Sequence, residues 1–337
     1  MSENILTVKD LKTYFYTASG VAKAVDGVSF NIAKGETMGI VGESGSGKSV
    51  TSSSIIRLLP PRTGKIVGGS IEFEGKDVLA LSKKELNDFR GKDIAVIFQD
   101  PMTSLDPVFK IGKQMTEMIM EHQNVTKDEA WKMAVEALNK VGIPEPEKRM
   151  NSYPYELSGG MCQRVIIAMA VCCKPKLIIA DEPTTALDVT VQAQVLELLK
   201  ELQRDMDTAI LLITHNLGVV WEMCDKVMVM YAGNTVEFTD TKTLYSNPRH
   251  PYTWGLLDSM PKLSDESKGE LKTIPGTPPD LRLTGKCCNF YNRCPYVTEA
   301  CTQSVPPLVE VEPGHFVACH RQNLTNKLEK GEGLKDE

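Results

Sequence analysis

The first third of the chain consists of short runs that predict β-strands around one glycine-rich turn. From Ile5 to about Phe30 the sequence reads ILTVKDLKTYFY and then AKAVDGVSFNI, in which apolar and polar positions alternate. Such alternation, rich in Val, Tyr and Phe, is typical of paired strands. The next segment, ETMGIVGESGSGKSVTSSSIIRLL, reads as an apolar strand, a glycine-rich turn and a helix. Two more strand-like runs, SIEFEGKDV and DIAVIFQD, follow it.

The middle of the chain, from about Ile111 to Ala170, has a helical pattern. Within it, TKDEAWKMAVEALNKVG opens with a capping box, in which Thr126 can cap the helix and Glu129 can reach back. Gly142 ends this helix. Three apolar runs follow, KLIIADEP, AILLITHN and KVMVMYAG, which are typical of buried parallel strands. Strands that alternate with helices predict an α/β sheet with a helical insertion.

After about Thr241 the composition changes. NPRHPYTWGLL and IPGTPPDL are rich in proline and turn formers, a group of cysteines follows, and the chain closes on the polar stretch RQNLTNKLEKGEGLKDE. We therefore expect a main domain over residues 1–240, with its helical part at about 110–170. A cysteine-containing extension over 241–320 and a disordered tail over 321–337 complete the prediction.

Composition and charge narrow the class of protein. A length of 337 residues allows one large domain with an appendage or two domains. The net charge of −6 does not favour nucleic acid as the main partner, because phosphate backbones are bound by basic faces. We find no secretory signal and no apolar run long enough to span a membrane, so we expect a cytoplasmic protein. Its nine cysteines should then be thiols or metal ligands rather than disulfides.

The turn GESGSGKS fits the pattern G-x-x-x-x-G-K-[ST] of a phosphate-binding loop. Glycines let backbone N–H groups turn towards phosphate oxygens, and the helix that follows points its N-terminal donors at the same anion. Lys48 would reach the β- and γ-phosphates, and the Ser49 hydroxyl would bind Mg²⁺. An ordinary Gly/Ser turn is the alternative, but a strand before the turn and a helix after it favour the phosphate loop. The residues expected to surround the phosphates are Gly42, Ser44, Gly45, Gly47, Lys48 and Ser49.

A second acidic element supports this interpretation. LIIADEP places Asp181 and Glu182 at the end of a buried strand, where α/β proteins gather their ligands. Asp181 can hold Mg²⁺, and Glu182 can polarise an attacking water as a general base. Alone, such a pair is more often a solvated turn. A phosphate loop in the same chain favours the catalytic interpretation.

A third element indicates a dimer. Ser158, Gly159 and Gly160 stand directly before a helix in LSGGMCQRVIIAMAV, which makes a second anion site at a helix N-terminus. A single nucleotide needs one such loop. We therefore expect the second site to complete the first site of a partner chain.

Together these motifs resemble the ATP-binding subunit of ABC transporters, in the oligopeptide/dipeptide/nickel importer group. The resemblance runs from about Leu6 to His320, and LSGGM stands at the family's signature motif. Met161 replaces the glutamine found in many ABC proteins, as is common in the peptide-importer group. The resemblance implies an ABC-type P-loop ATPase: a RecA-like α/β core, an antiparallel β subdomain and an α-helical subdomain, here with a small C-terminal extension.

The resemblance also assigns roles to single residues. Gln99 in IFQD is the Q-loop glutamine, which contacts Mg²⁺ and senses the membrane subunits. Asp188 belongs to the loop that runs between the two nucleotide sites, and His215 is the switch histidine at the γ-phosphate. Phe15 fits the aromatic residue that stacks on adenine. Its neighbours Tyr14 and Tyr16 remain alternatives.

The implied function is ATP hydrolysis that powers import of di- and oligopeptides. Two ATPase chains, related but different in sequence, would close around two molecules of ATP with Mg²⁺. They would act on two permease subunits, and through them on a substrate-binding protein, from the cytoplasmic face of the membrane without spanning it. The alternatives are another cargo of the family, such as nickel or a sugar, and a soluble ABC ATPase of translation or DNA maintenance.

The cysteines fall into two sets. Apolar surroundings indicate small core residues for the first set: Cys162, Cys172, Cys173 and Cys224. The second set lies in a loop-rich segment with too little apolar content for a core of its own, where a metal would supply a crosslink: Cys287, Cys288, Cys294, Cys301 and Cys319.

The family resemblance implies a [4Fe–4S] cluster on Cys288, Cys294, Cys301 and Cys319. His315 and His320 leave a mixed Cys/His zinc site open. Unliganded thiols are the third alternative. A metal here is expected to be structural, and a redox sensor that gates ATP hydrolysis is a further interpretation.

Overall fold

A computed structural model of the chain describes residues 3–185, 187–260 and 273–323. The chain forms two compact units and passes between them several times. The first unit comprises Met1–Ile5, Ile32–Thr37 and Phe73–Leu212, and the second comprises Leu6–Asn31, Met38–Glu72 and Ile213–Glu337. Elements at a boundary are described with the unit that holds most of their residues. The predicted tail lies outside the described residues apart from 321–323.

The first unit has three strands of one sheet in the order β8-β7-β6. β6 pairs with β7 in parallel, with Ile94 opposite Leu177 and Ile97 opposite Ala180. All four of these residues are buried, as the apolar run KLIIADEP predicts for β7. The strands of this unit are β5 (Lys76–Asp77), β6 (Ile94–Ile97), β7 (Leu177–Asp181) and β8 (Ala209–Thr214).

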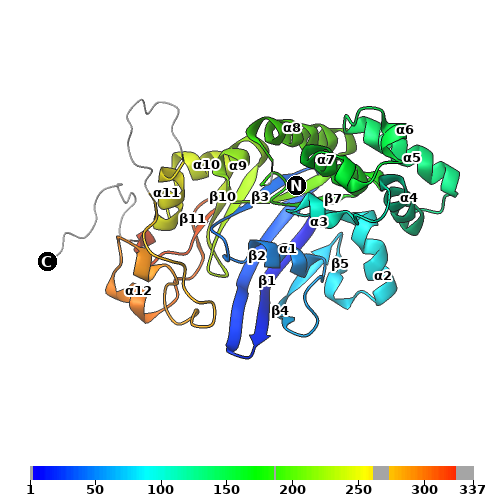
Figure 1. The fold of residues 1–337 in the computed structure, drawn as a ribbon. Coiled ribbons are helices and arrows are strands. Elements are labelled where there is room, and N and C mark those ends of the chain that lie inside the picture. Colours follow the sequence, from blue (N-terminus) through cyan, green and yellow to red (C-terminus); the bar gives the residue numbers. More distant parts are fainter. Residues whose placement is uncertain (1–2, 186, 261–272, 324–337) are drawn as a thin grey trace, which may run out of the picture. The chain divides into compact units, whose positions relative to one another are not determined.

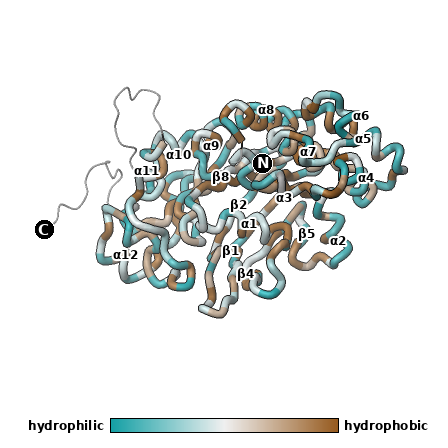
Figure 2. Tube along the Cα trace, viewed as in Figure 1, coloured by the Kyte–Doolittle hydropathy of each residue, from teal (hydrophilic) through white to brown (hydrophobic). Residues whose placement is uncertain are grey.

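Most helices of the first unit lie where the helical pattern predicts them. Its helices are α2 (Lys83–Asp88), α3 (Pro101–Ser104), α4 (Ile111–His122), α5 (Lys127–Lys140), α6 (Pro146–Arg149), α7 (Gly159–Cys172) and α8 (Val189–Met206). The predicted capping box is confirmed, since Thr126 accepts a hydrogen bond from the Glu129 N–H and the Glu129 carboxylate accepts one from the Thr126 N–H. α5 packs against both α4 and α7 (Figure 1). α8 carries both apolar and polar residues (Figure 2), and it buries its apolar face.

The second unit contains strands from two sheets, with the orders β2-β1-β4 and β11-β12-β10-β9-β3. β3 runs parallel to β9, and β10 returns antiparallel to β9. The paired strands predicted for the first thirty residues are therefore confirmed as neighbours in one sheet. The strands are β1 (Asn4–Thr17), β2 (Gly20–Ala33), β3 (Thr37–Val41), β4 (Gly64–Phe73), β9 (Lys226–Tyr231), β10 (Asn234–Asp240), β11 (Val309–Glu312) and β12 (His315–Val317).

Short helices connect these strands. They are α1 (Lys48–Ile55), α9 (Leu217–Met223), α10 (Thr241–Ser246), α11 (Pro251–Asp258) and α12 (Glu299–Gln303). α1 carries the residues that follow the glycine-rich turn. A hydrogen bond of 2.8 Å between the hydroxyls of Thr13 and Ser54 joins it to β1. Across the described part of the chain, no helix has both the length and the apolar character needed to cross a membrane.

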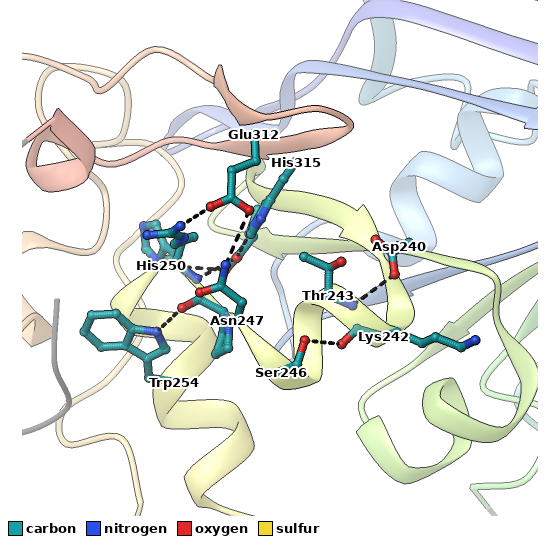
Figure 3. A network of polar contacts seen from close by, with 12 residues as sticks. Asp240, Lys242, Thr243, Ser246, Asn247, His250, Trp254, Glu312 and His315 are labelled. Atoms are coloured by element: carbon teal, nitrogen blue, oxygen red, sulfur yellow. Dashed lines mark hydrogen bonds and ion pairs between the residues drawn. The ribbon is translucent and has the colours of Figure 1, made fainter. Parts of the chain in front are cut away.

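The end of the extension is joined to β10 and to the segment before α11 by strand pairing and a network of polar contacts. β12 pairs antiparallel with β10, and Glu237 of β10 is fully buried. His315 donates from Nε2 to the Glu237 carboxylate over 2.8 Å. On the neighbouring strand, Glu312 reaches Arg249 and Asn247 in the segment before α11 (Figure 3). Residues 309–317 thus extend the sheet of the second unit.

Candidate active site

The predicted phosphate loop connects β3 to α1 in a shape that only glycine permits at two positions. Gly42 has φ 151° and Gly47 has φ 106°, both outside the usual range of other residues. A Cβ on Gly42 would lie 2.2 Å from the Met230 carbonyl oxygen, and one on Gly47 would lie 2.3 Å from the Ala24 carbonyl oxygen. β2 and β9 therefore press directly against the loop and fix its course.

Lys48 is buried inside this loop. Its side-chain ammonium donates to the carbonyl oxygens of Gly42, at 2.7 Å, and Glu43, at 3.0 Å. The ammonium is thereby held at the start of α1, where the first N–H groups of the helix also point. Ser49, one residue further on, is exposed. Together these groups form the donor set that a phosphate needs.

Sequence reasoning missed two residues that hold the loop from the far end of the chain. The Glu43 N–H donates to the Tyr252 hydroxyl over 2.8 Å. Both oxygens of the Glu43 carboxylate accept hydrogen bonds from the Arg293 guanidinium, at 2.6 and 2.9 Å. More than 200 positions separate the partners in each pair, so local patterns carried no signal for them.

The predicted switch histidine lies on a turn of fixed geometry. His215 directly follows β8 and is exposed. The Thr214 hydroxyl accepts from the Asn216 N–H at 3.0 Å, and the Asn216 side chain caps α9. The residues on either side thus hold the backbone and leave the imidazole of His215 on the surface of the second unit.

In the first unit, Glu182 stands directly after β7 with a φ of 49°, an unusual value for a residue with a side chain. Its carboxylate accepts from the Gln99 amide at 3.0 Å and from the Thr185 hydroxyl at 2.8 Å. The structure thus brings together two predicted site residues that are 83 positions apart. Asp181, the last residue of β7, lies beside them in sequence and is half-buried.

The signature motif and the Asp188 loop lie next to each other. Ser158 caps α7 by accepting from the Met161 N–H at 3.3 Å, and Gly159 and Gly160 form the first turn. A Cβ on Gly160 would lie 2.9 Å from Val191 of α8. α8 is itself capped by Asp188, which accepts from the Val191 N–H at 2.9 Å. Small residues at the start of α7 therefore let two helix N-termini approach closely.

The three candidates for the adenine contact have different environments on β1. The Tyr14 hydroxyl donates to Asp26 over 2.7 Å, and burial followed by this hydrogen bond raises the pKa of Tyr14 to about 12. Phe15 is half-buried, with its ring close to Gly64. Tyr16 is 43% exposed. Tyr14 is thus already held by a partner within the second unit, and the choice of Phe15 stays a prediction.

The prediction of an iron–sulfur cluster or zinc site is wrong. Within residues 3–185, 187–260 and 273–323, no three or more His, Cys, Asp or Glu side chains are arranged to hold a metal ion. The four predicted ligands are free cysteines: Cys288, Cys294, Cys301 and Cys319. Burial raises the pKa of Cys288 to about 12 and that of Cys294 to about 11.

The error lies in treating the cysteine segment as a fold without a core. Phe290 is only 3% exposed and packs against Tyr231 and Tyr252, at 5.2 and 5.4 Å between ring centroids. Residues of β9 and α11 thus supply a core for this segment. The two histidines considered for zinc have other partners, since His315 binds Glu237 and His320 donates to the Ser304 carbonyl.

Family models match two parts of the chain. Residues 25–185 match the ABC transporter family, and residues 236–301 match the C-terminal region of oligopeptide/dipeptide transporters. The first region includes the phosphate loop and the signature motif. The second includes Tyr252 and Arg293.

Proteins of similar sequence cover nearly the whole chain. The oligopeptide transport ATP-binding protein OppD of Bacillus subtilis is 54% identical, over 93% of this chain and 87% of its own length. OppD of Escherichia coli is 51% identical, over 95% of this chain and 94% of its own. The dipeptide transport ATP-binding protein DppD of B. subtilis is 49% identical, over 95% and 96%. None of these names describes an iron–sulfur protein.

Solved structures support the same fold. The dimeric ATP-binding cassette MJ0796 bound to ADP and Pi matches with a TM-score of 0.63 and 26% identity, over 70% of this chain and 98% of its own. The cassette cbiO1 of Clostridium perfringens matches with a TM-score of 0.62 and 29% identity, over 73% and 92%. The chain therefore belongs to the ATP-binding proteins of ABC transporters, in the oligopeptide/dipeptide group.

Proposed function

We propose that this chain is the ATP-hydrolysing subunit of a transporter that imports di- and oligopeptides. The observation that carries this proposal is the phosphate loop of the second unit. Two of its glycines have no room for a side chain, and it encloses a buried lysine ammonium at a helix start. The match of residues 236–301 to the C-terminal region of peptide transporters supports the narrower choice of cargo.

ATP would bind with its phosphates at the loop. Lys48 would exchange the carbonyl oxygens of Gly42 and Glu43 for phosphate oxygens, and the N–H groups of Gly45, Gly47 and the start of α1 would add further donors. Phe15 is proposed to stack on the adenine, because its ring is half-buried and Tyr14 is engaged by Asp26.

The hydroxyl, amide and carboxylate oxygens of Ser49, Gln99 and Asp181 suit Mg²⁺, which prefers oxygen ligands. When bound, Mg²⁺ neutralises charge on the β- and γ-phosphates. Glu182 is proposed as the general base, since two hydrogen bonds hold its carboxylate in one orientation. His215 is proposed to contact the γ-phosphate.

A second ATPase chain would complete each nucleotide site. Ser158 and Gly159 are exposed at the N-terminus of α7, where backbone N–H groups can receive an anion. Asp188 caps the adjacent helix in the same region. The dimeric state of the cassette MJ0796 supports such an assembly. We propose a homologous but different chain as the partner.

The membrane partners are proposed to be two permease subunits, with a substrate-binding protein acting through them. Three apolar side chains on either side of QDPMTSLDP support a docking surface in the first unit: Phe98, Val108 and Phe109, with exposed fractions of 44%, 68% and 40%. We propose that these side chains, exposed close together in the sequence, contribute to one contact surface for another protein. The chain would then lie at the cytoplasmic face of the membrane.

The test is peptide uptake and ATP turnover in vesicles that contain the assembled transporter. Glu182→Gln should lower turnover by a factor of about 10²–10⁴ and leave ATP binding intact. Glu197→Gln is the matched control, because Glu197 is an exposed carboxylate on α8 that pairs with Lys200 and Arg204. Unchanged turnover in Glu182→Gln would refute the catalytic role of this residue. Stimulation of ATP turnover by nickel or a sugar, and not by peptides, would identify a different cargo. Failure to co-purify with permeases would favour a soluble ABC ATPase.

A further inference from the structure

We propose that Arg293 and Tyr252 position the phosphate loop by holding Glu43, an inference that rests on the proposed function as an ATPase. The C-terminal extension would then contribute to the binding of ATP. Arg293 is a positioning residue, because it acts on the nucleotide through Glu43.

The contact between Arg293 and Glu43 is bidentate. Nη1 of Arg293 lies 2.6 Å from one carboxylate oxygen of Glu43, and Nη2 lies 2.9 Å from the other. Paired charge-assisted hydrogen bonds of this kind fix orientation as well as distance. The Arg293 side chain is 5% exposed and that of Glu43 is 28% exposed, so the guanidinium is largely shielded from water.

The guanidinium of Arg293 is itself held from several other sides. Its Nε donates to the Pro275 carbonyl at 2.9 Å, and Nη2 donates to the Ile274 carbonyl at 3.2 Å. Nη1 also lies 3.3 Å from the Tyr231 hydroxyl. These groups fix the guanidinium independently of Glu43. The C-terminal extension therefore presents Glu43 with a guanidinium whose position is already fixed.

Tyr252 holds the backbone of the same residue. Its hydroxyl accepts the Glu43 N–H over 2.8 Å, and its ring is fully buried against Tyr231 at 4.7 Å between centroids. Glu43 is therefore anchored at its N–H group and at both side-chain oxygens. Both anchors come from residues C-terminal to β9.

Glu43 in turn accepts hydrogen bonds from two groups of the phosphate loop. The Glu43 carbonyl accepts from the Ser46 N–H at 3.2 Å and from the Lys48 ammonium at 3.0 Å. A displacement of Glu43 would therefore move both the loop backbone and the lysine. A chain of hydrogen bonds within the second unit thus connects Arg293 to Lys48.

Charge gives Arg293 a second effect on the nucleotide. Glu43 introduces a carboxylate into a loop that binds phosphate, and like charges repel. The guanidinium neutralises that carboxylate through both oxygens. Without Arg293, ATP would meet an uncompensated negative charge as well as a less constrained loop.

The effect of charge on ATP binding distinguishes a positioning role of Arg293 from a role that only attaches the extension. Arg293→Met should raise the KM for ATP about tenfold, a coupling of about 1.4 kcal/mol, within the range typical of interacting sites. The kcat should change by less than about twofold, because the interaction should stabilise bound ATP and the transition state equally. Adding Glu43→Gln to Arg293→Met removes the uncompensated charge and should restore most of the affinity.

The experiment measures ATP binding by calorimetry on the full chain, and KM and kcat in the assembled transporter. Arg282→Met is the matched control, because Arg282 lies in the same segment but makes an exposed ion pair with Asp280. Tyr252→Phe keeps the buried ring and removes the acceptor for the Glu43 N–H. It should raise the dissociation constant about threefold, which is the loss of a hydrogen bond worth roughly 0.7 kcal/mol.

Each of the following outcomes would overturn the proposal or the function on which it rests. If Arg293→Met binds ATP as tightly as Arg282→Met does, or if Glu43→Gln fails to restore its affinity, Arg293 does not act through the charge of Glu43. If Arg293→Met does not fold, the Tyr252→Phe protein carries the test, and unchanged ATP binding there overturns the proposal. A wild-type chain that neither binds nor hydrolyses ATP would refute the proposed function instead.

Discussion

Replacing Phe290 with Ala tests directly how the cysteine-containing segment is stabilised. Phe290 is 3% exposed and packs against the rings of Tyr231 and Tyr252, with the ring of His250 at 5.9 Å. If this aromatic cluster is the core of the segment, its loss should open the segment. If a metal held the segment together, the loss would matter less.

The burial of Phe290 sets the size of the effect. Removing a buried phenylalanine side chain typically destabilises a core by about 3–5 kcal/mol, through lost transfer free energy and the cavity left behind. Tyr231 and Tyr252 both hold fixed hydrogen bonds, so their rings have little freedom to fill the space. We therefore expect the local opening free energy of residues 288–303 to fall by about 3 kcal/mol or more.

The assay is hydrogen exchange followed by mass spectrometry on the full chain, because a protein with two units does not unfold in one step. A fall of 3 kcal/mol should speed exchange in residues 288–303 by a factor of about 100. Leu283→Ala is the control in the same extension, since Leu283 is 74% exposed and its loss should change exchange very little. The reasoning fails if Phe290→Ala exchanges like Leu283→Ala, or if a chelator alone opens the segment.

Two further predictions concern the loop and the buried histidine. Gly47→Ala should abolish ATP binding in calorimetry, because its Cβ would lie 2.3 Å from a backbone oxygen and its φ of 106° is strained for alanine, whereas Gly75→Ala, which meets no atom within 4 Å, should not. Burial lowers the pKa of His250 from 6.5 to about 4, and its Nδ1 accepts the Tyr252 N–H only while neutral. The unfolded chain then binds more protons than the folded chain between these values, so stability present above pH 6.5 should be lost as the pH falls towards 4. His250→Asn, which retains a capping acceptor, should reduce this loss in melting temperatures measured from pH 7.5 to 4.5, and an unchanged pH profile would contradict the assignment.

Local sequence patterns were sufficient for most elements of the fold. The capping box at Thr126 and Glu129 and the apolar runs of β7 to β9 each depend on residues within one turn or one strand. Such patterns can be read without knowing the fold, because the same hydrogen bonds and φ angles determine both the pattern and the element.

Long-range partners could not be predicted in the same way. Arg293 and Glu43 lie 250 positions apart, and no periodicity relates them. The wrong prediction of a metal centre has the same physical origin. The composition around Cys288 and Cys301 indicated a segment without a core, and nothing local revealed that Tyr231 and Tyr252 supply one.

The proposed site residues are divided between the two units. This division separates nucleotide binding from the activation of water. The second unit holds the groups proposed to bind the nucleotide, among them Lys48 with its anchors on Glu43. The first unit holds Glu182, proposed as the general base, and Gln99, whose amide donates to its carboxylate. Since Arg293 and Tyr252 belong to the second unit, the C-terminal extension should influence how tightly ATP is held. It should leave Glu182 and Gln99 unaffected, which is why KM and kcat distinguish the two groups of residues.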